Sequence, residues 1–202
     1  MKGYIFDLDG VLVDTAKYHY IAWKTIAKEF NFELTPQHNE QLKGIGREVS
    51  LHQILQWAGK TLSETDFTDT ALRKNKLYLE QISSIDSSEL LPGVLNFLQL
   101  LKAHHKKIAL GSASRNARLV LERTGILPLF DAIVDGTMVS KAKPNPEVFL
   151  KAAEGLRLPP ADCCVFEDAP AGVQAAKSAG MKVIGVGNPE VLKAADTVIP
   201  NF

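Results

Sequence analysis

The chain has 202 residues, of which 46% are hydrophobic and 23% are charged. This composition is ordinary for a soluble globular protein, and the length suits one large domain or a core with a smaller inserted domain. The 23 basic and 23 acidic residues give a formal net charge of zero. A nucleic-acid partner is therefore not expected, because such proteins usually carry a basic excess.

No stretch approaches the roughly 20 apolar residues of a membrane helix. The apolar run within Met1–Asp7 is too short for a signal peptide, and acidic residues follow it too soon. The adjacent Cys163 and Cys164 would point to opposite faces of a strand, so no disulfide is expected between them. Unpaired cysteines suit a reducing compartment. We therefore expect a cytoplasmic protein without membrane association.

The first apolar run, Gly3–Phe6, predicts a short buried strand, and residues 15–85 then show helical patterns without a good strand. Three apolar stripes predict helices: Ala16/Tyr20/Trp23/Ala27/Phe30, Leu51/Ile54/Leu55/Ala58 and Leu72/Leu79/Ile82. Thr35-Pro36 marks the start of a further helix, and Gly59 ends the second stripe. We expect residues 15–85 to form an inserted α-helical domain. Hinges are expected at Val13–Thr15 and Ile85–Gly93.

Strand and helix patterns alternate from residue 86 onward. Strands are predicted at Ile108–Gly111, Ala132–Val134, Cys163–Phe166, Val183–Val186 and, at an edge, Val198-Ile199. Helices are predicted at Val94–Ala103, Asn116–Thr124, Pro146–Leu156, Gly172–Ala179 and Glu190–Ala194. This alternation implies right-handed crossovers and a parallel sheet. The predicted fold is therefore a doubly wound, Rossmann-like α/β core, residues 1–14 and 86–202, with a small helical cap.

Two carboxylates stand just past the first strand, at Asp7 and Asp9, and Gly10 follows them. In open α/β sheets, ligands bind outside the carboxyl ends of the strands. A carboxylate directly after a buried strand is costly unless it is paired or metal-bound. Taken alone, the Asp-x-Asp-Gly segment is equally compatible with an ordinary turn, in which Asp and Gly are common.

Three later segments favour the catalytic interpretation. Ser112-Ala113-Ser114 follows the second strand and can offer a hydroxyl and backbone N–H groups to a phosphate. Lys143 lies in a loop before a helix and supplies a positive charge, and Glu167-Asp168 closes another strand. Carboxylates that converge on one rim repel each other, and Mg²⁺, which prefers carboxylate oxygen, relieves that repulsion.

This set of groups suits phosphoryl transfer. Asp7, held by metal and lysine, can attack phosphorus and form an aspartyl phosphate. Asp9 can protonate the leaving oxygen and later deprotonate the acceptor. Lys143 and the cation can neutralise the oxygens of the transferring group.

On these motifs, which occur in family order over most of the chain, the sequence resembles the haloacid dehalogenase superfamily. The resemblance implies that Asp7 is the nucleophile and Asp9 the general acid/base, while Ser112 and Lys143 hold the transferring phosphoryl group. It assigns Mg²⁺ to Asp7, Glu167, Asp168 and the Asp9 carbonyl. It also implies that the helical insert is a mobile cap.

The predicted cap carries further polar residues. Thr15 and His19 share one helix face, and the Arg47 guanidinium suits bidentate phosphate binding. Taken singly, a residue such as His19 is more often a surface or capping residue, and one such as Lys74 is more often a solvated helix charge. Together the Asp14–His19, Asn39–Arg47, Arg73–Asn75, Ser112–Ser114 and Gly185–Gly187 segments resemble the β-phosphoglucomutase branch.

By that resemblance, Arg47 holds the non-transferring phosphate, while Lys43, Gly44 and Lys74 line the sugar site. Thr15 and His19 couple cap closure to Asp9. The resemblance further adds Ala113, Ser114 and Asn116 to the substrate site.

The function implied is interconversion of β-D-glucose 1-phosphate and glucose 6-phosphate, with glucose 1,6-bisphosphate as intermediate and activator. The expected partner is a small sugar phosphate, and a monomer is expected because the site needs one chain. Two alternatives remain: a sugar-phosphate phosphatase of the same superfamily, and a non-catalytic binding protein, although the latter predicts loss of Asp7, Asp9 or Lys143. The sequence departs from the branch at Gly111, where alanine is frequent, and the branch usually continues into a final helix beyond the position of Phe202.

Overall fold

A computed structural model describes all 202 residues, and its centre is a six-stranded parallel sheet with the order β3-β2-β1-β4-β5-β6. The strands are β1 (Gly3–Phe6), β2 (Lys107–Gly111), β3 (Ala132–Val134), β4 (Cys163–Glu167), β5 (Lys182–Val186) and β6 (Thr197–Ile199). All six predicted strands are confirmed, including the edge position of the last. The doubly wound α/β prediction is therefore confirmed.

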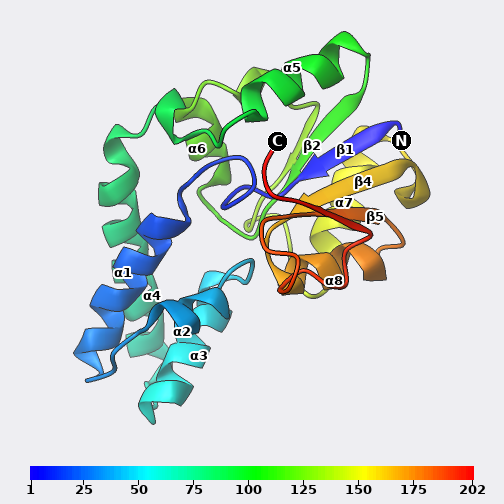
Figure 1. Ribbon diagram of the computed structural model, residues 1–202. Coiled ribbons are helices and arrows are strands. Elements are labelled where there is room, and N and C mark those ends of the chain that lie inside the picture. The colour runs from blue at the N-terminus through cyan, green and yellow to red at the C-terminus, as the bar shows by residue number, and fades with distance from the viewer.

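Four helices cover the two faces of the sheet (Figure 1). They are α5 (Val94–Ala103), α6 (Ala117–Arg123), α7 (Glu147–Leu156) and α8 (Pro170–Ser178). Successive strand residues point to opposite faces, so Ile5 and Val165 pack with α7 and α8, whereas Phe6 and Phe166 pack on the α5 and α6 side. Strands buried on both faces explain the continuous apolar runs in the sequence.

The segment between β1 and α5 forms a separate group of helices beside the sheet (Figure 1). Its members are α1 (Ala16–Glu29), α2 (Pro36–Glu40), α3 (Arg47–Ala58) and α4 (Glu64–Gln81), followed by short 3₁₀ turns at Ile82–Ser84 and Ser87–Glu89. Local signals bound these helices: Thr35 and Ser63 cap the starts of α2 and α4, and Gly59 ends α3 in a left-handed conformation. The group buries its own apolar cluster, which includes Trp23, Leu51 and Ile54.

Two sequence predictions about helices are wrong. Residues 190–194 form turns, in which the Asn188 side chain accepts a hydrogen bond from the Glu190 N–H. The Leu72/Leu79 stripe is not the buried face of α4, since Leu72 is exposed. That face carries Thr70, Ala71, Lys74 and Tyr78 instead.

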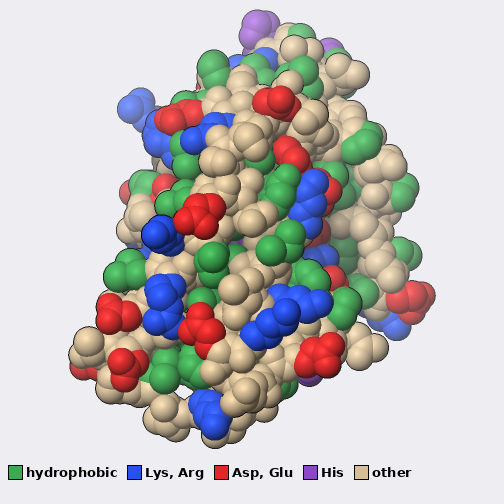
Figure 2. Space-filling model, turned by 90° about the vertical axis from the view of Figure 1, so that its left-hand side faces the viewer, with side chains coloured by type: hydrophobic (Ala, Val, Ile, Leu, Met, Phe, Trp, Pro, Cys, Tyr) green, Lys and Arg blue, Asp and Glu red, His purple; other side chains and the backbone are tan.

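Acidic and basic side chains are interspersed over the face of the molecule shown in Figure 2, in keeping with the zero net charge. None of the helices combines the length and the apolar character needed to cross a membrane.

Candidate active site

The polar residues predicted at the strand ends meet at one edge of the sheet. Asp7 follows β1, Ser112 follows the neighbouring β2, and Glu167 ends β4 on the other side of β1. The chain winds outward from β1 in both directions, so this edge is the topological switch point at which doubly wound proteins bind ligands.

A buried lysine joins two of the carboxylates. Lys143 Nζ donates to Asp7 Oδ1 and to Glu167 Oε1, each at 2.6 Å, and all three side chains are almost fully buried. Burial opposes the charged amine, yet the two carboxylates outweigh it and raise the pKa of Lys143 above its usual range. Glu167 Oε2 also accepts from the Ala169 N–H at 2.8 Å. The lysine is thereby fixed as a permanent cation beside Asp7.

Asp168 is a buried carboxylate with little compensation. Burial, Glu167 and Asp7 raise the pKa of Asp168 well above its usual range, and its ion-pair partner Lys43 is 3.9 Å away. Gly10, with φ of +81°, leaves room for it, because a Cβ there would collide with the Asp168 carboxylate. A crowded set of hard oxygen donors, in which the Asp168 carboxylate lacks a close cation, fits a divalent metal such as Mg²⁺.

Asp9 is held by the first turn of α1. The Thr15 hydroxyl donates to Asp9 Oδ1 and so does not cap its own helix, while His19 Nε2 is 3.6 Å from Asp9 Oδ2. Burial and, to a smaller extent, the Asp7 charge raise the pKa of Asp9 to about 6, although the Thr15 hydrogen bond opposes the shift. A carboxyl group that titrates near neutrality is suited to general acid/base work.

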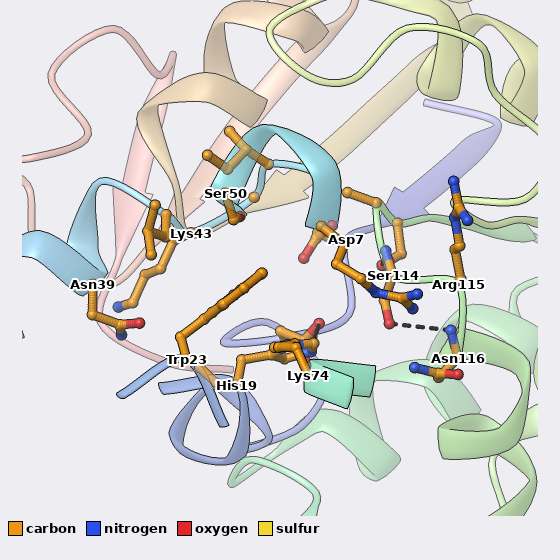
Figure 3. Close-up of a pocket in the computed structure, with 18 of the residues that line it drawn as sticks. Asp7, His19, Trp23, Asn39, Lys43, Ser50, Lys74, Ser114, Arg115 and Asn116 are labelled. Carbon is orange, nitrogen blue, oxygen red and sulfur yellow. Dashed lines mark hydrogen bonds and ion pairs between the residues drawn. The ribbon is translucent and has the colours of Figure 1, made fainter. Parts of the chain in front are cut away.

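Between the sheet edge and the helical group lies a pocket (Figure 3). Asp7, Asp9 and residues 112–116 form its core side. The opposite side carries polar and aromatic residues of α1, α2, α3, α4 and the turn between α2 and α3, namely His19, Trp23, Asn39, Lys43, Arg47, Lys74 and Asn75. Ser112 Oγ accepts from the Ser114 N–H and Ser114 Oγ from the Asn116 N–H, so hydroxyl groups shape the loop beside Asp7. The pocket has the mixed apolar and polar lining of a small-ligand site.

Lys74 is a buried cation in this pocket. Its Nζ is 2.7 Å from His19 Nδ1 and lies over the rings of Trp23 and Tyr78, at 4.8 and 5.1 Å from their centroids. Burial lowers the pKa of Lys74 to about 7, and the nearby Arg47 charge adds to the shift. The interpretation of Lys74 as a solvated helix charge is therefore wrong.

Arg47 opens α3, and side-chain contacts link it to the core. Arg47 Nη2 donates to Asn75 Oδ1, which also accepts from Asn116 Nδ2, both at 2.8 Å. Arg115 Nη2 lies 3.0 Å from Glu48 Oε1 across the same boundary. A Cβ on Gly44 would lie 3.0 Å from the Ala169 Cβ. The helical group is therefore closed against the core.

Of the eleven residues predicted to bind substrate, nine line the pocket: His19, Lys43, Gly44, Arg47, Lys74, Ser112, Ala113, Ser114 and Asn116. The other two do not line the pocket: Thr15 contacts Asp9, and Lys143 contacts Asp7. Sequence reasoning missed Trp23, Asn75 and Arg115. Asn75 and Arg115 are sequence neighbours of predicted residues, which is the signal that could have found them.

Paired aspartates and a serine at the ends of parallel strands, a lysine from the loop before α7 and an inserted helical cap define the haloacid dehalogenase class of α/β protein. A family model described as a haloacid dehalogenase-like hydrolase matches residues 1–180. A β-phosphoglucomutase from Bacillus subtilis is 47% identical over 98% of this chain and 89% of its own. The crystal structure of a β-phosphoglucomutase from Clostridium difficile superposes with a TM-score of 0.97 at 43% identity, over 100% of this chain and 91% of that one.

A fructose-1-phosphate phosphatase from Escherichia coli is 31% identical over 91% of this chain and 95% of its own. The chain therefore belongs to the haloacid dehalogenase-like hydrolase family, and within it to the β-phosphoglucomutase branch.

Proposed function

We propose that this protein is a β-phosphoglucomutase that interconverts β-D-glucose 1-phosphate and glucose 6-phosphate. The observation that carries the proposal is the second set of cations across the pocket from Asp7, contributed by Arg47 and Lys74. A bisphosphate intermediate needs two anion sites that face each other, whereas hydrolysis of a monophosphate needs one. The near full-length similarity to two β-phosphoglucomutases supports the same conclusion.

In one half-reaction, an Asp7 carboxylate oxygen attacks one phosphorus of β-glucose 1,6-bisphosphate. The bond between that phosphorus and the sugar oxygen breaks, which gives an aspartyl phosphate and a glucose monophosphate. Asp9 gives its proton to that leaving oxygen. Lys143 and Ser112 hold the oxygens of the transferring group. The pocket geometry supports these roles, since Asp7 and Ser112 both line it and Lys143 is hydrogen-bonded to Asp7.

In the other half-reaction, which comes first once Asp7 is phosphorylated, the free hydroxyl of β-glucose 1-phosphate attacks the aspartyl phosphate. The bond between Asp7 and phosphorus breaks, Asp9 takes the hydroxyl proton, and β-glucose 1,6-bisphosphate forms. The β-glucose 1,6-bisphosphate must turn around between the two steps, so each anion site accepts either phosphate. Arg47 holds the distal phosphate, helped by the partial positive charge at the N-terminus of α3. Lys43, Gly44 and Lys74 face the sugar. Added glucose 1,6-bisphosphate acts as activator by phosphorylating Asp7.

Asp7, Asp168 and the Asp9 carbonyl are the proposed ligands of Mg²⁺. Glu167 remains a further candidate, although its two oxygens are already engaged by Lys143 and the Ala169 N–H. The ion supplies charge neutralisation for the transferring phosphoryl group.

Residues 15–85 are proposed to move as the cap, and residues 1–14 and 86–202 to form the catalytic core. Closure over the substrate expels water, which otherwise hydrolyses the aspartyl phosphate. Because one chain lines the whole pocket, we propose a monomer that acts on its sugar phosphate in the cytoplasm.

The test incubates the protein with β-glucose 1-phosphate, Mg²⁺ and a trace of glucose 1,6-bisphosphate, and measures glucose 6-phosphate and free phosphate together. Rapid glucose 6-phosphate with little free phosphate is expected. Free phosphate alone would favour the second candidate, a sugar-phosphate phosphatase. The similarity to the E. coli fructose-1-phosphate phosphatase is the observation that supports this candidate. Asp7→Asn should lose more than about 10³-fold in both channels, because it removes the nucleophile.

Arg47→Ala separates the two candidates further. Loss of the distal phosphate contact should lower mutase flux by about 10²-fold, since charged hydrogen bonds of this kind contribute roughly 2–3 kcal/mol. Hydrolysis of a small aryl phosphate, which has no second phosphate, should change less than about threefold. Equal losses in the two assays would contradict the assignment of Arg47.

A further inference from the structure

Tyr78 on α4 has a fully buried side chain whose hydroxyl has no hydrogen-bond partner. A buried hydroxyl without a partner costs about 1–3 kcal/mol. Tyr78 lies one helical turn after Lys74, on the buried face of α4 that looks toward α1. The contribution of this residue must therefore come from its ring.

The Tyr78 ring stacks on the His19 imidazole, with 3.9 Å between centroids and 22° between planes. Lys74 Nζ lies 5.1 Å from the Tyr78 centroid and 2.7 Å from His19 Nδ1. The stack restricts rotation of the imidazole about its χ2 angle, because a rotated ring would collide with the phenol face.

This fixed ring plane orients both nitrogens of His19. An ammonium group has only protons to donate, so Nδ1 accepts from Lys74 and the ring proton resides on Nε2. Nε2 is 3.6 Å from Asp9 Oδ2 and has no other partner. Thr15 already donates to Asp9 Oδ1. Thr15 and His19 thus approach the two oxygens of the Asp9 carboxylate from different sides.

We propose that Tyr78 is a positioning residue whose ring holds the His19 imidazole edge-on between Lys74 and Asp9, with Nε2–H directed at the carboxylate. The inference rests on the proposed mutase function for its kinetic consequence. Tyr78 does not line the pocket, so it acts through His19 and not on the substrate.

Two variants separate the ring from the hydroxyl. Tyr78→Phe keeps the stack, and its kcat for glucose 6-phosphate formation should stay within about twofold of wild type. Tyr78→Leu removes the stack, and kcat should fall at least about tenfold, since small misplacements of catalytic groups have effects of this size or larger. KM should change less than about threefold, because the pocket lining is retained. Equal losses in both variants, or full kcat in Tyr78→Leu, would overturn the proposal.

Phe67→Leu is the matched control. The Phe67 ring packs on His52, with 4.3 Å between centroids and 31° between planes, in the same helical group but away from the pocket. Its loss removes a similar histidine–aromatic pair and should leave kcat unchanged. Thermal unfolding of each variant shows whether it is folded, and Tyr78→Met, which fills more of the cavity, replaces Tyr78→Leu if the latter is not.

A second readout does not depend on turnover. ¹⁵N–¹H correlations of the five histidines, assigned with His19→Gln, report the His19 tautomer at pH 6, below the Lys74 pKa of about 7. Wild type and Tyr78→Phe should show the Nε2–H form, and Tyr78→Leu a mixture. An Nδ1–H form in wild type would overturn the proposal. If wild type shows the Nε2–H form but makes no glucose 6-phosphate, the proposed function fails while the positioning of His19 stands.

Discussion

Lys74 carries a charge in a place where an apolar side chain would be more stable. It is 3% exposed, it lies near Arg47, and its close partners are a neutral imidazole and two aromatic faces. Cation–π contacts offset only part of the desolvation cost. A phosphate or sugar ligand would supply the missing partner. We therefore interpret the uncompensated desolvation of Lys74 as a loss of stability that the binding site requires.

Lys74→Met should therefore stabilise the free protein while weakening substrate binding. We expect a gain of about 1–2 kcal/mol at pH 7 and a rise in Tm of roughly 2–8 °C. The pKa of Lys74 is lowered from 10.5 to about 7, so wild type loses stability as the pH falls from 10.5 toward 7, whereas the variant does not. The gap in Tm should be largest at or below pH 7 and narrow toward pH 10.5. A variant that is less stable than wild type at pH 6 would contradict this account.

The two chain segments that join cap and core are tied to each other at Glu89. The Asp14 N–H donates to the Glu89 carbonyl at 2.9 Å, and Val13 and Leu90 form an antiparallel bridge. Side chains from the first turn of α1 add to this, since the Tyr18 hydroxyl donates to Glu89 Oε1 at 2.6 Å. The same first turn positions Thr15 and His19 on Asp9. The contacts to Glu89 and to Asp9 thus come from one helical turn.

Tyr18→Phe removes the hydrogen bond to Glu89 and keeps the aromatic ring. Stability should fall by only about 1 kcal/mol, as for one hydrogen bond. A looser hinge should admit water to the aspartyl phosphate and raise the ratio of free phosphate to glucose 6-phosphate several-fold. Tyr20→Phe is the control, because the Tyr20 hydroxyl donates to the Leu34 carbonyl at 3.1 Å inside the cap. An unchanged product ratio in Tyr18→Phe, or an equal change in Tyr20→Phe, would count against a coupling role for the hinge.

At the scale of the whole molecule, folding gathers Asp7, Asp9, Glu167 and Asp168 at one edge of the sheet with Lys143 as the buried cation. A metal ion that binds this cluster binds only the folded state, and it should therefore stabilise the protein by mass action.

Chelation of Mg²⁺ should stop turnover, and addition of Mg²⁺ at about 100 times Kd should stabilise the folded chain by about 2.7 kcal/mol. The Mg²⁺-dependent rise in Tm should largely disappear in Asp168→Asn. Asp69→Asn, which changes an exposed carboxylate on α4, should keep it. A full Mg²⁺ shift in Asp168→Asn would remove Asp168 from the set of ligands.

Much of the fold could be predicted because its signals are local. The six strands are short apolar runs, and Gly59, Thr35 and Ser63 mark helix ends by their own backbone or side-chain chemistry. The segment 190–194 was mispredicted because a local side-chain hydrogen bond of Asn188 competes with the helix. The buried face of α4 was mispredicted because polar residues point inward at a binding site, against the usual pattern.

The sequence by itself determined the chemistry: which carboxylates, which hydroxyl and which lysine stand at strand ends, and that a helical insert lies between the first and second strands. Only the tertiary structure decided the environment of the cap residues. The contact of Lys74 with His19 spans 55 residues, and that of Asn116 with Asn75 spans 41. The burial of Lys74, the stack of Tyr78 on His19 and the closed boundary at Arg115 and Glu48 all depend on such distant segments meeting. Burial and neighbouring charge set the pKa values and side-chain orientations on which catalysis depends, and these are properties of the folded arrangement that no local pattern encodes.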